Sequence, residues 1–117
     1  MRATVRSLHS PDVDLDHFVP DDPEDVGVLI QVFVGPADGP GEESFDVVVC
    51  TPTWLTGWVR SHGPTIGRHH LVVEWYDFPQ VRTFLTAAVE DEHGDTWVEL
   101  AARIGRIGKW EFEDYRE

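Results

Sequence analysis

At 117 residues the chain has the length of one domain, and 41% apolar residues are enough to build a compact core. Twenty-two Asp and Glu against nine Lys and Arg leave a formal charge of −13, which repels nucleic acid and anionic lipid and attracts basic partners. One cysteine excludes an intrachain disulfide. Because no apolar leader or bilayer-length apolar run is present, we expect a protein of the reducing cytoplasm.

The first half of the chain predicts three strands. Residues 2–10 form the first, and an irregular acidic segment follows to residue 25. Residues 28–34 and 45–51 are rich in β-branched and aromatic side chains, which is typical of strands. The turn residues between them, at 35–41, predict that these two strands pair as a hairpin with a long loop.

Helices and short strands are expected in the second half. Thr51 and Pro52 predict the start of a short helix with an apolar stripe of Trp54, Leu55, Trp58 and Val59, ended at residues 63–64. Residues 67–75 predict a fourth strand. A helix capped by Asp77 places Val81, Phe84, Leu85 and Ala88 on one buried face, and Gly94 ends it.

The last helix begins with capping-box spacing between Thr96 and Glu99. Its apolar stripe comprises Trp97, Leu100, Ala101 and Ile104. Alternation at residues 110–113 then predicts a fifth strand.

These elements predict an α+β fold in a single domain spanning residues 1–117. We expect an antiparallel sheet of four to five strands, with two longer helices and one short helix mainly on one face. Alternation predicts that the helix-covered face carries Val28, Ile30, Val32, Phe45, Val47, Val49, Leu71, Val73 and Trp75. The other face would carry Leu29, Gln31, Phe33, Asp46, Val48, Cys50, His70, Val72 and Glu74. Such a half-apolar face is either a partner surface or is covered by the short Trp54 helix.

No motif in the sequence predicts a catalytic, metal or cofactor site. Asp12, Asp14 and Asp16 match the start of a calcium loop, but His17 stands where the turn needs glycine. Adjacent His69 and His70 would point to opposite faces of a strand and cannot chelate one ion together. The cysteine lies in an apolar strand and is expected to be buried and inert. The five tryptophans are better explained by core packing than by ligand stacking.

Several short segments, taken in order along the chain, resemble those of a known family. They are residues 10–12, 42–52, 54–55, 67–69, 73–77, 94–97 and 110–115, the last reading Trp110-Glu111-Phe112-Glu113-Asp114-Tyr115. The series resembles the immunity protein 8 family of bacterial polymorphic toxin systems and covers nearly the whole chain. The resemblance implies a cytoplasmic antitoxin that occludes a toxin domain, without catalytic residues or cofactors.

Charge and resemblance together favour binding and neutralisation of a cognate toxin with a basic surface, such as a nuclease. The alternatives are a small hydrolase-type enzyme using His and carboxylate residues, and an acidic adaptor that binds another basic protein. Two candidate toxin-binding regions follow from the sequence. The acidic segment contributes Asp12, Asp14, Asp16, Asp21, Asp22, Glu24 and Asp25. The uncovered sheet face contributes Gln31, Phe33, Asp46, His70 and Glu74.

Overall fold

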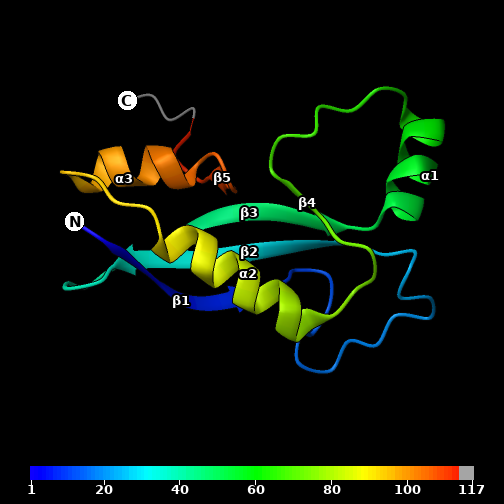
Figure 1. Ribbon diagram of the computed structural model, residues 1–117, viewed down its shortest axis with the longest axis horizontal. Helices are drawn as coiled ribbons and strands as arrows, with labels where there is room; N and C mark the ends of the chain where they lie inside the picture. Colours follow the sequence, from blue (N-terminus) through cyan, green and yellow to red (C-terminus); the bar gives the residue numbers. More distant parts are fainter. Residues whose placement is uncertain (114–117) are drawn as a thin grey trace.

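The computed structural model describes residues 1–113 and has a five-stranded sheet with three helices, which confirms the predicted α+β class (Figure 1). Asp114 and Tyr115, the end of the last family-like segment, lie outside the described residues. The elements in chain order are β1 (Ala3–His9), β2 (Gly27–Pro36), β3 (Glu43–Cys50), α1 (Pro52–His62), β4 (His70–Val72), α2 (Phe78–Glu90), α3 (Trp97–Ile104) and β5 (Lys109–Trp110).

The sheet is mixed, whereas the sequence predicted antiparallel pairing throughout. β1, β2 and β3 form an antiparallel meander. The far edge of β3 is shared by two short strands: β5 pairs antiparallel with Phe45 and Asp46, and β4 pairs parallel with residues 48–50. β4 runs parallel because the connection through α1 returns the chain to the sheet in the direction of β3.

The predicted caps of two helices are confirmed by side-chain hydrogen bonds. The amide of Trp54 donates to Thr51 Oγ1 at 3.4 Å, and the amide of Glu99 donates to Thr96 Oγ1 at 3.2 Å. Asp77 precedes α2 without a side-chain capping bond. The shortest helix is α3, with 8 residues, rather than the Trp54 helix, which has 11. No helix in residues 1–113 is long and apolar enough to cross a membrane.

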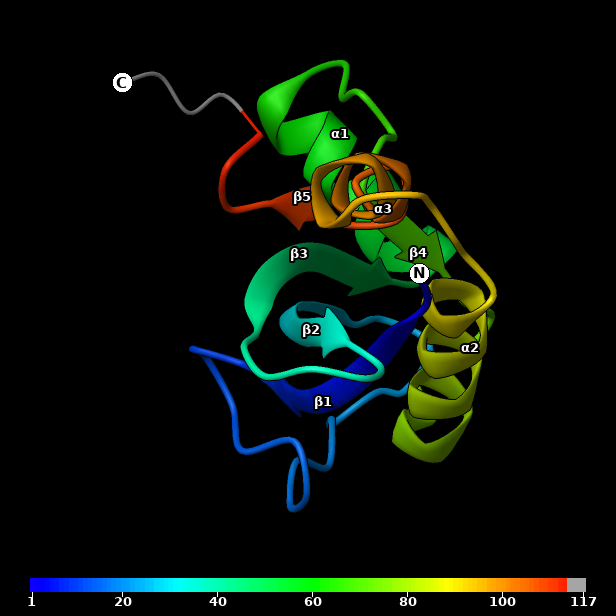
Figure 2. The same ribbon diagram turned by 90° about the vertical axis from the view of Figure 1, so that its left-hand side faces the viewer.

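The core lies between one face of the sheet and helices α2 and α3, on the same side of the three long strands (Figure 2). The predicted inward-facing residues of β2 and β3 are all buried, so the predicted core face of both strands is confirmed. From the helices, the core receives Val81, Leu85 and Val89 of α2 and Leu100, Ala101 and Ile104 of α3. We call the opposite face the open face.

Besides Trp58, which is 39% exposed on α1 (Pro52–His62), two further aromatic side chains expected in the core are exposed. Trp75 is 50% exposed because β4 ends at Val72, so the alternation of the predicted strand does not continue to residue 75. Phe84 is 56% exposed because the buried stripe of α2 runs through Val81, Leu85 and Val89 instead. Both predictions of burial were therefore wrong.

Helix α1 lies at one end of the sheet, away from α2 and α3 (Figure 1). It has no fully buried residue, and its Trp54, Trp58 and His62 rings form a continuous stack with centroid spacings of 5.3 and 3.8 Å. The Trp54 ring lies against Gly27, where a β-carbon would come within 2.0 Å of it. Trp54 therefore covers the Gly27 end of the open face, and the rest of α1 stands apart.

Candidate partner-binding surfaces

The centre of the open face is a row of polar side chains that crosses four strands. Register pairs His9 with Gln31, Gln31 with Asp46, and Asp46 with Lys109. The His9 imidazole and the Gln31 side-chain amide are in direct contact, because His9 Nδ1 lies 3.1 Å from Gln31 Oε1. We call these four residues the polar row. Gln31 and Asp46, which were both predicted on this face, are neighbours on it. His9 and Lys109 were not predicted there, because their pairing depends on strand registers that alternation does not reveal.

Asp46 is the titratable group most affected by its place in the polar row. Partial burial raises its pKa, and the nearby charge of Glu111 raises it further. A hydrogen bond from Gln31 and the charge of Lys109 act in the opposite direction. The Asp46 carboxylate therefore lies in a half-buried site, and its neighbours Gln31 and Lys109 partly offset the rise of its pKa.

Apolar residues flank the polar row on both sides. Phe33 pairs with Ser44 on one side, and Leu29 pairs with Val48 on the other. All four are half-buried, so Phe33 belongs to the surface layer of the open face rather than to the core. His70 continues the second flank as the register partner of Val48. The open face thus mixes half-buried apolar side chains with polar ones, which is typical of a partner surface.

Glu74 does not join the other predicted residues of the open face. It follows the end of β4 and is exposed beside α2, where it lines a groove with Trp75 and Phe84. The predicted set was therefore wrong at this position, for the same reason as at Trp75: the strand is shorter than its sequence pattern.

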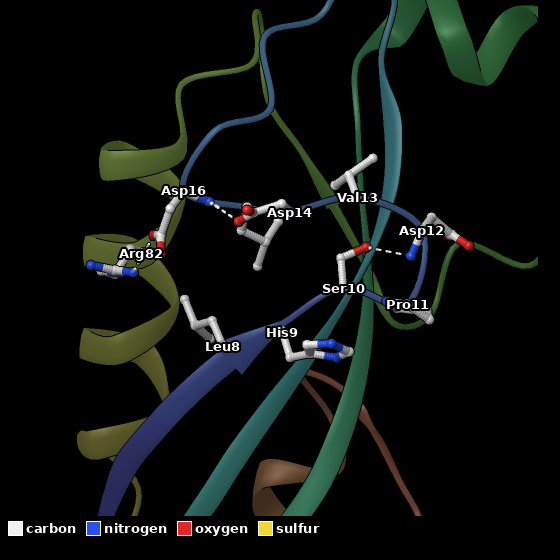
Figure 3. A pocket seen from close by; sticks show the side chains of 10 residues that line it. Leu8, His9, Ser10, Pro11, Asp12, Val13, Asp14, Asp16 and Arg82 are labelled. Carbon is white, nitrogen blue, oxygen red and sulfur yellow. Dashed lines mark hydrogen bonds and ion pairs between the residues drawn. The ribbon is translucent and has the colours of Figure 1, made fainter.

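The first half of the acidic segment forms a hollow of about 510 Å³ between β1 and α2 (Figure 3). Local bonds order its backbone: the amide of Asp16 donates to Asp14 Oδ1, and the amide of Asp12 donates to Ser10 Oγ. Asp16 also faces Arg82 of α2, with 3.7 Å between Oδ1 and the guanidinium. Within residues 1–113, no group of three His, Cys, Asp or Glu side chains is arranged to hold a metal ion.

Asp14 forms an exposed pair with His17, with 2.9 Å between Oδ2 and Nδ1. The hydrogen bond to His17 is the main cause that lowers the pKa of Asp14, and the same bond raises the pKa of His17. Both groups are fully solvated, so this pair orders the loop locally and adds little to stability.

The second half of the acidic segment surrounds an aromatic ring. Asp12, Asp21, Asp22 and Asp25 line a hollow of about 520 Å³ together with Trp54 and Gly27. Glu24 is exposed next to them, and its amide donates to Asp22 Oδ1 at 2.9 Å. All of these carboxylates are exposed, as predicted from the prolines of the segment.

Each of the two hollows of the acidic segment adjoins the open face. The first hollow includes His9, which begins the polar row. The second includes Gly27, which begins the column of open-face residues on β2. The two regions predicted separately from sequence therefore form one surface, with carboxylates along its rim and an apolar and polar centre.

Two residues with potentially reactive side chains, Cys50 and His69, lie in structural surroundings. Cys50 is fully buried, and burial raises the pKa of its thiol, which disfavours the nucleophilic thiolate. His69 Nε2 lies 2.7 Å from the backbone oxygen of Gly105, so this imidazole fixes the approach of the 67–70 turn to α3.

Comparison with known proteins gives one match. No match was found among curated proteins or among solved structures. The family model described as Immunity protein 8 matches residues 3–115, which is nearly the whole chain. The chain therefore belongs to the immunity protein 8 family.

Proposed function

We propose that this immunity protein acts in the cytoplasm of its producing cell, where it binds a cognate toxin domain and occludes its functional surface without altering it chemically. The observation that carries the proposal is the continuous surface formed by the open face and the acidic segment. A sheet face with half-buried apolar residues, bordered by exposed carboxylates, matches the anatomy of an interface with an apolar centre and a charged rim.

The expected partner has a basic surface. The chain carries a net charge of −13, and the carboxylates of residues 21–25 concentrate that charge beside Trp54. Toxin domains that cleave nucleic acids carry basic grooves for phosphate groups, and a carboxylate rim competes for the same groove. In this arrangement the rim accelerates association, and half-buried groups such as Phe33 and Leu29 determine how long the complex lasts.

Co-expression tests the proposal directly. Cells that express the toxin domain encoded beside this chain should survive when the chain is also expressed, and the two proteins should co-purify in a fixed stoichiometry. Rescue without a complex would mean that the chain acts on the product or target of the toxin, as an enzyme would. A stable complex with a different basic protein, and no rescue, would identify an adaptor instead.

A further inference from the structure

A second apolar surface lies between residues 71–75 and the first turns of α2. It is a groove of about 390 Å³. Leu71, Val73 and Val81 form its inner wall and are buried or half-buried. Its rim exposes two large aromatic side chains, since Trp75 and Phe84 are each at least half exposed. Two such rings at one groove form a contiguous apolar patch rather than scattered surface residues.

The groove borders the edge of the sheet. β4 pairs with β3 alone and is the last strand of the main strand order. The amide of Val48 donates to the His69 oxygen, and the amide of Val73 donates to the Cys50 oxygen. In a parallel ladder alternate residues bond to the neighbouring strand, so the N–H and C=O of Val72 point away from β3. This edge offers backbone hydrogen-bonding groups next to an apolar groove.

We propose that an extended segment of the cognate toxin adds to β4 as a further strand and places its apolar side chains in this groove against Trp75 and Phe84. Extended backbone is the occupant because it satisfies the outward groups of Val72, while alternate side chains enter the groove. The proposal rests on the proposed function for the identity of the partner, and assigns to it a second contact outside the open face.

Charge favours a basic segment over a second copy of this chain. Among the described residues that line the groove, Glu74 alone is charged. A Lys or Arg on the added strand would lie beside this carboxylate, in the field of a chain whose net charge is −13. Two copies of the chain would instead bring two strongly acidic surfaces together.

The backbone contact is tested by amide hydrogen exchange measured by NMR, on the free chain and on its complex with the toxin domain encoded beside it. The Val72 amide should exchange at least about tenfold more slowly in the complex, because strand addition gives it an acceptor. An unchanged Val72 exchange rate in a complex that forms normally would overturn strand addition.

Substitutions test the energetics of the same contact. Val72→Pro removes the outward donor without touching a β3 bond, and Val72→Ala retains it. Phe84→Ala removes an exposed side chain of the groove, and Val98→Ala, at an exposed apolar position of α3, is its matched control. We expect Val72→Pro and Phe84→Ala to weaken toxin binding about tenfold or more, and both alanine controls to change it less than about threefold.

Melting temperatures of the free variants separate binding from folding. If Val72→Pro does not fold, the exchange measurement and the Phe84 pair still decide the matter. Equal toxin affinity of wild type and Phe84→Ala, with an unprotected Val72 amide, would overturn the groove contact and leave the proposed function standing. If the wild-type chain binds no toxin, both fail. If the Val72 amide of the free chain becomes protected from exchange as the chain concentration rises, the occupant is a second copy of the chain. That result would overturn the proposal that a toxin segment occupies the groove.

Discussion

Gly27→Ala tests whether Trp54 alone fixes the position of α1. A β-carbon at residue 27 would lie 2.0 Å from Trp54 Cε2 and within 2.5 Å of two further ring atoms, so the indole ring must retreat by roughly 1 Å or more. Because α1 has no fully buried residue, we expect the helix to move with its ring while the strand stays in place.

The size of the effect follows from two opposing contributions. Overpacking costs about 1–3 kcal/mol, and replacing a strand glycine by alanine returns about 0.5–1 kcal/mol of backbone entropy. We therefore expect Gly27→Ala to lower the free energy of unfolding by about 1–2 kcal/mol. Gly57→Ala is the control: it lies in α1 with no atom within 4 Å of the added carbon, and should stabilise the chain by about 0.5–1 kcal/mol.

Urea denaturation followed by tryptophan fluorescence and circular dichroism measures both changes. The decisive sample is the double variant with Trp54→Ala. Once the ring is absent the methyl group has room, so the double variant should be more stable than Trp54→Ala alone by about 0.5–1 kcal/mol. The coupling energy should then equal the overpacking cost of about 1–3 kcal/mol. Additive losses from the two substitutions would refute the reasoning, because the clash would then lie elsewhere.

Three further outcomes can be checked by denaturation and stopped-flow measurements. Tyr76→Phe removes a buried hydroxyl that has no hydrogen-bond partner among the described residues, so the free energy of unfolding should rise by up to about 1–2 kcal/mol. A comparable fall in the free energy of unfolding would reveal a bound water as the partner of the hydroxyl. Phe33→Ala should cost about 2 kcal/mol or more of toxin affinity, and an equal loss of stability would place Phe33 in the core. Replacing the acids of residues 21–25 with Asn or Gln should slow toxin association at low salt and flatten its dependence on ionic strength, and an unchanged slope would remove them from the interface.

The polar row predicts how stability depends on pH. The folded pKa of Asp46 is raised, mainly by burial, so the folded state binds this proton more tightly than the unfolded chain. The contribution of Asp46 to the free energy of unfolding therefore falls as the pH rises from the unfolded-state pKa of 3.8 through the folded-state pKa. Asp46→Asn should stabilise the chain at neutral pH relative to wild type, and the difference should shrink on acidification. A difference that grows toward low pH in urea denaturation would contradict the raised pKa.

Sequence patterns predicted the elements well where alternation and capping act over a whole segment. Alternation predicted which side chains of β2 and β3 face the core, because a register slip of one residue would expose every valine of the core. The caps at Thr51 and Thr96 followed from spacing alone. The joining of Gln31 and Asp46 into one face was a direct consequence of that alternation.

The errors occur where tertiary pairing overrides local preference. Residues 67–75 are β-prone throughout, but pairing with β3 extends only over His70–Val72, which leaves Trp75 and Glu74 outside the strand. His69 has a positive φ of 67°, held by its contact with Gly105, and this turn starts the strand late. No local pattern reveals a contact between residues so distant in the chain.

The sharing of one β3 edge by β4 and β5 has a consequence for synthesis of the chain. β1, β2 and β3 pair through neighbouring segments, and β4 follows within twenty or so residues. The strand beside Phe45 is made last, at Lys109–Trp110, where the lack of a side chain at Gly108 lets the backbone approach Phe45 and Val47. Until that segment leaves the ribosome, half of the β3 edge has no partner, and the stacking of Trp110 on Phe45 is missing. The sheet is therefore completed only after residue 110 has been made, and a chain shortened before residue 109 keeps an open strand edge through which it can aggregate.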